Sequence, residues 1–329
     1  MASEPIPINR LARQAAGPDA TQTAARIMLG RAVRDLRVQA KLTQVDVASK
    51  IHVSNSTISR LEDGKGKPEQ RTLDGVMTFF KVGPQQRAEL QAALVRAQEP
   101  EWFQHRYTDC APGWFQRLLG LESMAISLQG YDARLVTGLL QTKEYAGAVI
   151  RTGLHLAEWG SDEERLRVEL RLERQERVFG QPHPPHCIFY MDESVLRRRV
   201  DTDDVMLAQM QHLRAMADRP YITIRFVLLD RLIAGNAGTM HGSMTHLQFG
   251  RGGLPDLVYA EFYEDAKYYS RPDDPCIDDV TAGQSKPGPA KASDYERFLQ
   301  LLLRIGGEAC ASPVESRIMI DDAIKRFSR

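Results

Sequence analysis

The sequence contains few cysteines and no long apolar run. Its four cysteines, Cys110, Cys187, Cys276 and Cys310, lie far apart and form no CxxC pair. Such spacing is typical of reduced thiols in a cytoplasmic protein. No apolar stretch approaches the roughly 18 residues that a membrane helix needs, and the N-terminus lacks the apolar core of a signal peptide. We therefore expect a cytoplasmic protein with no membrane partner.

The common catalytic motifs are also absent. The chain has no GxSxG, HExxH, P-loop or GxGxxG pattern, so we expect neither an enzyme nor a bound cofactor. Two alternatives stay open. The HPPHC segment (His183–Cys187) is either a surface loop or a zinc site. His241 and His246 flank the start of an expected strand and either face a cavity with Glu261, as in a DNA-tethered enzyme, or serve only the fold.

Charge is balanced overall but not along the chain. The totals are 43 basic and 43 acidic residues, and residues 1–99 contain 15 basic and 10 acidic residues. This first part therefore has a net charge of +5 and the remainder a net charge of −5. A basic N-terminal part suits contact with nucleic acid, because neutralising phosphates contributes affinity for any sequence.

The most informative stretch is TQVDVASKIHVSNSTISRLEDG, from Thr43 to Gly64. Thr43 and Ser54 are good N-cap residues for two short helices, and His52 lies in the turn between them. Apolar residues recur at helical spacing on the inner side of both helices. Gly64 follows the last periodic residue, where a left-handed C-terminal cap is common. The stretch therefore predicts a helix, a tight turn and a second helix.

Short polar side chains remain on the outer face of the second helix. Asn55, Ser56, Ser59 and Arg60 point outward at helical spacing. Asn and Arg pair bidentately with adenine and guanine edges in the major groove. The alternative is a helix hairpin inside a bundle that touches no DNA.

This pattern resembles the lambda-repressor-like helix-turn-helix family, also called the xenobiotic-response-element type, and the resemblance extends to about Phe80. It implies that Gln44 contacts phosphate and that Asn55, Ser56 and Arg60 read bases. His52 departs from the family, in which glycine usually holds this position. A non-glycine residue with a positive φ costs roughly 1 kcal/mol, so we expect a slightly strained turn.

Lys65 and Lys67 follow the second helix and are either phosphate contacts or solvated lysines. On the first expected helix of this domain, Arg31, Arg34 and Arg37 are likewise either contacts to the DNA backbone or part of a solvated basic face. The residues expected to bind DNA are Gln44, Ser54, Asn55, Ser56, Thr57, Ser59, Arg60, Lys65 and Lys67.

The chain divides by pattern into four parts. We expect a flexible tail at 1–24, an all-α five-helix helix-turn-helix domain at 25–98, and an aromatic-rich linker at 99–114. A second domain at 115–329 mixes helices with five strand candidates and ends in two helices that begin with capping boxes. This order predicts a multidomain protein whose second domain is α+β, with a small mixed sheet and C-terminal helices. The methionine stripe Met206–Met210 is either core or a docking surface.

Most of residues 115–327 is similar to the C-terminal domain of WhiJ-like or antitoxin-like actinobacterial regulators. The stretches that carry this similarity include RLVTGLLQTKEYAGAVI, YMDESVLRRRV and SPVESRIMI. It implies a sequence-specific transcription factor, often paired with a small protein encoded beside it. We therefore expect double-stranded DNA as a partner, read as a pseudo-palindrome by a homodimer. The second domain would sense a small protein or a ligand, or act chiefly as an antitoxin-like interaction module.

Overall fold

The computed structural model describes residues 24–153, 160–231, 242–250, 254–262, 265–271 and 293–328. The expected tail, His241 and most of the Pro/Asp-rich stretch at 270–291 lie outside these residues. The chain packs as two compact units, the first made mainly of Met1–Met124 and the second mainly of the residues that follow. No helix in the described part of the chain is long and apolar enough to cross a membrane.

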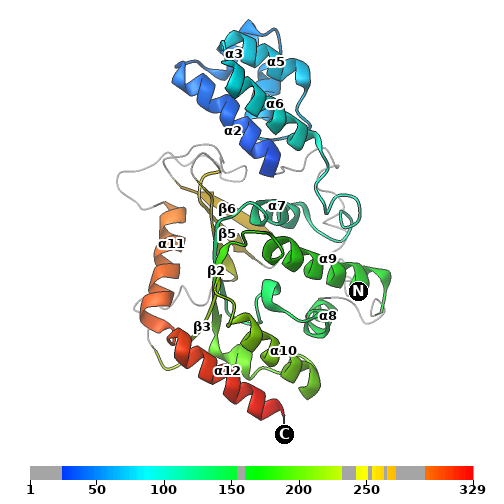
Figure 1. Ribbon diagram of the computed structural model, residues 1–329, viewed down its shortest axis with the longest axis vertical. Coiled ribbons are helices and arrows are strands. Elements are labelled where there is room, and N and C mark those ends of the chain that lie inside the picture. Colours follow the sequence, from blue (N-terminus) through cyan, green and yellow to red (C-terminus); the bar gives the residue numbers. More distant parts are fainter. Residues whose placement is uncertain are drawn as a thin grey trace, which may run out of the picture. The chain divides into compact units, whose positions relative to one another are not determined.

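Helices make up the first unit, as predicted (Figure 1). The expected five-helix arrangement consists of α2 (Ala24–Gln39), α3 (Gln44–Lys50), α4 (Asn55–Glu62), α5 (Gln70–Phe79) and α6 (Pro84–Gln98). Leu29, Val33, Leu73, Val76 and Leu94 pack in its core. The aromatic segment follows, and α7 (Gly113–Glu122) comes next.

Three of these helices end in the same way. Lys41, His52 and Lys81 have left-handed backbones, with φ of 57°, 57° and 51°. In each case the next amide donates to a carbonyl five residues back, as from Val53 N to the Ala48 oxygen at 3.0 Å. This Schellman pattern satisfies carbonyls that the helix end leaves unpaired. The strained turn predicted at His52 is therefore one instance of a repeated device.

Glycine allows α2 and α4 to cross closely. A Cβ on Gly30 would overlap the backbone carbonyl oxygens of Leu61 and Glu62. Gly64, with φ of +66°, ends α4 where a Cβ would lie 2.8 Å from the Ile27 amide nitrogen. The left-handed cap predicted at Gly64 is confirmed. The two glycines thus bring the helix that carries the polar face against α2.

The second unit is built on one six-stranded mixed sheet. Its strands are β1 (Ser127–Asp132), β2 (His186–Asp192), β3 (Ile222–Val227), β4 (Met244–Gln248), β5 (Leu257–Glu261) and β6 (Ala266–Ser270), in the order β3-β2-β1-β4-β5-β6. The pairs β1/β2 and β2/β3 are parallel, and the pairs from β1/β4 to β5/β6 are antiparallel. The mixed sheet was predicted, whereas β6 was missed.

Helices cover the sheet of this unit on both sides (Figure 1). The connections between the parallel strands carry α8 (Lys143–Thr152), α9 (Asp162–Phe179) and α10 (Asp203–Met216), with short turns at Gly138–Leu140 and Glu193–Leu196. At the C-terminal end lie α11 (Asp294–Arg304), the π-helical turn Ile305–Ala309, and α12 (Pro313–Phe327). Between the last two, Ala309 and Ala311 exchange backbone hydrogen bonds with the free edge of β3. The segment that joins the predicted C-terminal helices therefore protects a strand edge.

Candidate nucleic-acid interface

Side-chain caps fix the start of both helices in the Thr43–Gly64 stretch. The Thr43 hydroxyl accepts from the Asp46 amide at 3.2 Å, and the Asp46 carboxylate accepts from the Thr43 amide at 2.8 Å. The Thr43 hydroxyl also donates to the Asp46 carboxylate at 2.6 Å, and this bond, together with the bond from the Thr43 amide, lowers the pKa of the exposed Asp46 carboxyl. At the second helix the Ser54 hydroxyl accepts from the Thr57 amide at 3.1 Å. Both predicted N-caps are present, and each satisfies an amide that the first turn leaves unpaired.

The inner face of α4 is sealed into the first unit. Ile58 is fully buried and packs with Val47 and Ala48 of α3. Leu61 joins the core that α2, α5 and α6 build. Because this face is fixed by apolar contacts, the opposite face of α4 is held outward in one orientation.

The predicted site residues divide by exposure. Asn55, Ser56 and Arg60 are exposed on the outer face, while Thr57 and Ser59 are half-buried. Ser54 is exposed, but its hydroxyl also lies 2.8 Å from the hydroxyls of Ser56 and Thr57. The structure thus brings the polar residues together on one short helix, with Asn55 and Arg60 as its longest exposed side chains.

A buried carboxylate ties this helix to its neighbours. Glu62, 2 % exposed, accepts two hydrogen bonds from the Arg37 guanidinium, at 2.6 and 2.8 Å. The Gln44 amide donates to the same carboxylate at 2.9 Å. Removing one partner of such a buried pair costs about 3–5 kcal/mol, because the remaining charge is left uncompensated. Glu62 therefore orients Gln44 and joins α2, α3 and α4.

This network corrects one sequence expectation. Arg37 was considered as a backbone contact or part of a solvated face, and it is neither, because Glu62 engages it. Sequence reasoning missed Glu62 as the centre of the network. The available signal was an acidic residue directly after the buried Leu61, at the end of a helix whose other face is polar.

The two predicted lysines differ in their surroundings. Lys65 is half-buried, and its ammonium lies 3.2 Å from the Asp63 carboxylate. Lys67 is exposed, and no ion-pair partner is found for it in the part of the chain that the structure describes. Lys67 is therefore the more available of the two for a phosphate group.

The candidates in the second unit do not converge on a site. His246 pairs with Val258 across β4 and β5, so alternation along β5 places Glu261 on the opposite face. The proposed shared cavity of His246 and Glu261 is therefore wrong. His246 instead lies 3.0 Å from the Tyr295 hydroxyl of α11, and Glu261 accepts from the Tyr259 hydroxyl at 2.9 Å.

The other candidates serve the fold or lie apart. Within the described ranges, no group of three or more His, Cys, Asp or Glu residues could hold a metal ion. In the HPPHC segment both histidines are exposed and Cys187 is buried in β2. Met206 and Met210 are fully buried, so the methionine stripe is core.

Two family models match separate parts of the chain. Residues 28–90 match the model described as a helix-turn-helix domain. Residues 115–275 match a domain of unknown function (DUF5753). No curated protein and no solved structure matches the chain. The chain therefore carries a helix-turn-helix domain, the class of domain through which regulators bind DNA, followed by a mixed α/β domain to which no role is assigned.

Proposed function

We propose that this protein is a sequence-specific DNA-binding transcriptional regulator. The observation that supports it is the outer face of α4, where Asn55, Ser56 and Arg60 are exposed while Ile58 and Leu61 anchor the inner face. Asn and Arg side chains on a rigid helix match the donors and acceptors of base edges in the major groove. The nine residues named above, from Gln44 to Lys67, form the proposed interface.

Gln44, Lys65 and Lys67 take the positioning role in this proposal. Phosphate contacts fix the register of a protein on the duplex, and base contacts supply the specificity. Gln44 lies in the first turn of α3, where helix amides also favour an anion. The Glu62 bond leaves the Gln44 side-chain oxygen and one amide hydrogen for other partners.

A single helix of this length reads only a few base pairs, so the proposed regulator binds as a homodimer. Two-fold symmetry places two recognition helices about 34 Å apart on a pseudo-palindromic operator. The proposed domains are 25–98 for DNA binding, 99–114 as a linker and 115–329 for regulation, and the proposed location is the cytoplasm.

The second domain is proposed to sense a small protein or a ligand. Its similarity to WhiJ-like regulators supports this role. In the alternative, it is an antitoxin-like module that neutralises a partner protein, and DNA binding serves autoregulation. Affinity capture with the full chain distinguishes a protein partner from a small-molecule ligand, because a protein partner is retained in stoichiometric amount by the full chain and not by a chain lacking 115–329.

Two substitutions test the DNA interface. Arg60→Ala should weaken binding to the preferred operator by about 1–3 kcal/mol and relax one base position, because a bidentate base contact is lost. Lys67→Ala should weaken all sequences alike and reduce the salt dependence. The measurement is operator selection from random DNA, followed by affinity at several salt concentrations.

Arg96→Ala is the matched control, because Arg96 is exposed on α6 and lies outside the proposed interface. It should leave both the affinity and the preferred sequence unchanged. The proposal would be wrong if Arg60→Ala and Lys67→Ala bound DNA as the unsubstituted protein does.

A further inference from the structure

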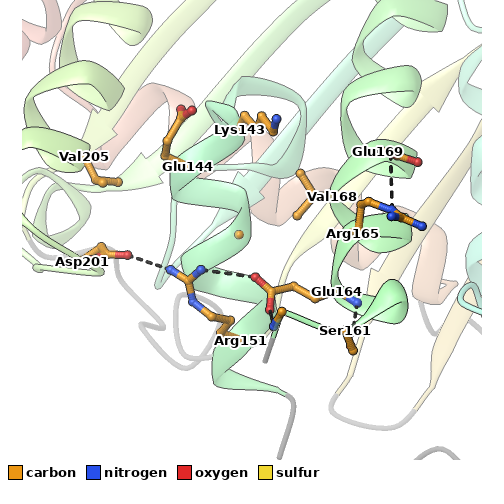
Figure 2. A pocket seen from close by; sticks show the side chains of 12 residues that line it. Lys143, Glu144, Arg151, Ser161, Glu164, Arg165, Val168, Glu169, Asp201 and Val205 are labelled. Atoms are coloured by element: carbon orange, nitrogen blue, oxygen red, sulfur yellow. Dashed lines mark hydrogen bonds and ion pairs between the residues drawn. The ribbon is translucent and has the colours of Figure 1, made fainter. Parts of the chain in front are cut away.

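A pocket of about 480 Å³ lies in the second unit between α8, α9 and the start of α10 (Figure 2). Ligand sites in proteins have volumes of roughly 300–1,000 Å³. The pocket is separate from the helix-turn-helix residues, and no function is assigned to it by the family match that covers this part of the chain.

The floor of the pocket is apolar. Gly147 of α8, Val168 of α9 and Val205 of α10 each contribute to the lining. A Cβ on Gly147 would lie 3.8 Å from the Arg151 Nη1 and 3.9 Å from the Val168 Cγ2, which are ordinary contact distances, so a methyl group fits here and a larger side chain would extend into the pocket. A hydrocarbon group of a ligand would lose contact with water on this floor, which favours binding.

Around the floor lies a ring of charges with one dominant junction. Arg151, in the last turn of α8, pairs with Glu164 of α9 at 3.2 Å and with Asp201 before α10 at 2.9 Å. Glu164 also accepts from the Gly160 amide at 2.6 Å. Figure 2 shows Arg151 between the two carboxylates, so this one guanidinium links three helix ends.

The ring carries an excess of negative charge. Its basic members are Lys143, Arg151 and Arg165, and its acidic members are Glu144, Glu164, Glu169 and Asp201. Arg165 also lies near two carboxylates, Asp162 at 2.8 Å and Glu169 at 4.0 Å. Both arginines are therefore engaged, and an anionic ligand would have to displace a carboxylate from either of them. Lys143 has no ion pair among the described residues, so the preference for a cation rests on the net charge of the ring, four acidic groups against three basic ones.

Glu144 is the carboxylate best placed to receive a ligand cation. It is exposed at the rim, and no ion pair is found for it among the residues that the structure describes. A cation bound there would keep its apolar body over Gly147, Val168 and Val205.

We propose that this pocket binds a small organic cation, an ammonium group on an apolar body, and that it is the ligand site of the regulatory domain. The role of the pocket as the ligand site of the regulatory domain rests on the proposed function. With its ammonium group at Glu144, the ligand contacts α8, α9 and α10 together through Gly147, Val168 and Val205. Binding is thereby coupled to the positions of these three helices.

The test uses the full chain with methyl-labelled valines, in the absence of DNA. Protonated n-hexylamine is titrated, with hexan-1-ol and hexanoate as neutral and anionic probes of the same length. The methyl signals of Val168 and Val205 should shift with the amine, while those of Val178, buried elsewhere on α9, should not. The alcohol and the acid should bind at least about tenfold more weakly, because neither has a cation for the acidic rim.

Two variants locate the binding. Glu144→Gln should weaken amine binding about threefold, as expected for one exposed charge contact, and Gly147→Leu should remove it by filling the floor. Glu176→Gln, an exposed residue of α9 outside the pocket, is the control. Unperturbed Val168 and Val205 signals with the amine, equal binding of hexanoate, or equal amine affinity in all variants would overturn the proposal. Since the readout needs no DNA, a failure of DNA binding would be seen separately.

Discussion

His52 combines a histidine side chain with a left-handed backbone, at φ of 57°. Such a conformation brings the Cβ close to the following carbonyl oxygen, which glycine avoids. The exposed imidazole itself gains no packing that would offset this strain. His52 therefore makes this turn less stable than it would be with glycine at the same position.

His52→Gly should stabilise the α3–α4 turn by up to about 1 kcal/mol, because the Cβ clash is lost and only part of the gain is offset by greater freedom in the unfolded chain. His52→Val should destabilise it by a similar amount or more, because a β-branched residue tolerates positive φ poorly. Hydrogen exchange at the α3 and α4 amides measures both effects. Equal protection in the two variants would show that the turn is unstrained.

His246 gives the second unit a defined response to pH. His246 lies on β4 against α11, and its exposed fraction is 3 %. Burial lowers the pKa of its imidazole, although the charge of Asp256 acts in the opposite direction. Because the folded pKa lies below the unfolded value, the unfolded chain binds the proton more readily. The contribution of neutral His246 to the free energy of unfolding is therefore complete above about pH 6.5 and is lost as the pH falls below that value.

His246→Asn removes this titrating group. The loss of unfolding free energy between pH 7.5 and pH 5.5 should therefore be smaller in the variant than in the unsubstituted protein. Urea unfolding at the two pH values measures this. His212, whose pKa is also lowered by burial, contributes equally to both proteins and cancels in the comparison. An identical pH dependence would rule out His246 as the cause.

At the scale of elements, the position of α4 depends on how closely α2 can approach it. The Gly30 position has no space for a Cβ, because backbone oxygens of Leu61 and Glu62 occupy it. Backbone atoms cannot move aside as a flexible side chain can. The orientation of the proposed reading face therefore depends on a residue of α2 that does not contribute to that face.

Gly30→Ala should destabilise the first unit by roughly 1–3 kcal/mol, the usual cost of overpacking, and should weaken DNA binding. The matched variant is Gly75→Ala in α5, where the new methyl would meet only the Ile51 side chain, at 3.2 Å. That variant should stay close to neutral. Thermal unfolding and operator affinity decide the matter, and equal effects of the two substitutions would refute the close-crossing account.

At the scale of the whole molecule, the proposed regulator depends on two copies meeting one operator. The described residues contain one helix-turn-helix per chain, and in the proposed complex a second chain reads the other half of the operator. The net charge of +5 in residues 1–99 supports the encounter with DNA, while the equally acidic remainder keeps the total neutral.

Inserting about five base pairs between the half-sites should reduce operator affinity at least about tenfold, because the second half-site turns to the opposite face of the duplex. Inserting a full turn of about ten base pairs should restore part of the binding if the linkers reach. Gel-shift titration with the three operators is sufficient. Equal affinity for all three operators would show that single chains bind independently.

Local chemistry made much of this protein predictable from the sequence. The N-caps at Thr43 and Ser54, the cap at Gly64 and the polar face of α4 follow from hydrogen bonding and periodicity within a few residues. The five helices and five of the strands followed from the same short-range patterns. A helix-turn-helix domain is therefore predictable from the sequence alone.

Tertiary structure decided which distant side chains meet. The sequence does not place Arg37 and Gln44 on one buried carboxylate, nor His246 and Glu261 on opposite faces of the sheet. Strand β6 was missed because it is held by pairing with the neighbouring β5, which its own sequence does not show. The pocket at Arg151 arises from three helix ends that are separated by many residues along the chain. Such contacts depend on packing between elements, whose energy is shared by residues far apart in sequence, so no local pattern records them.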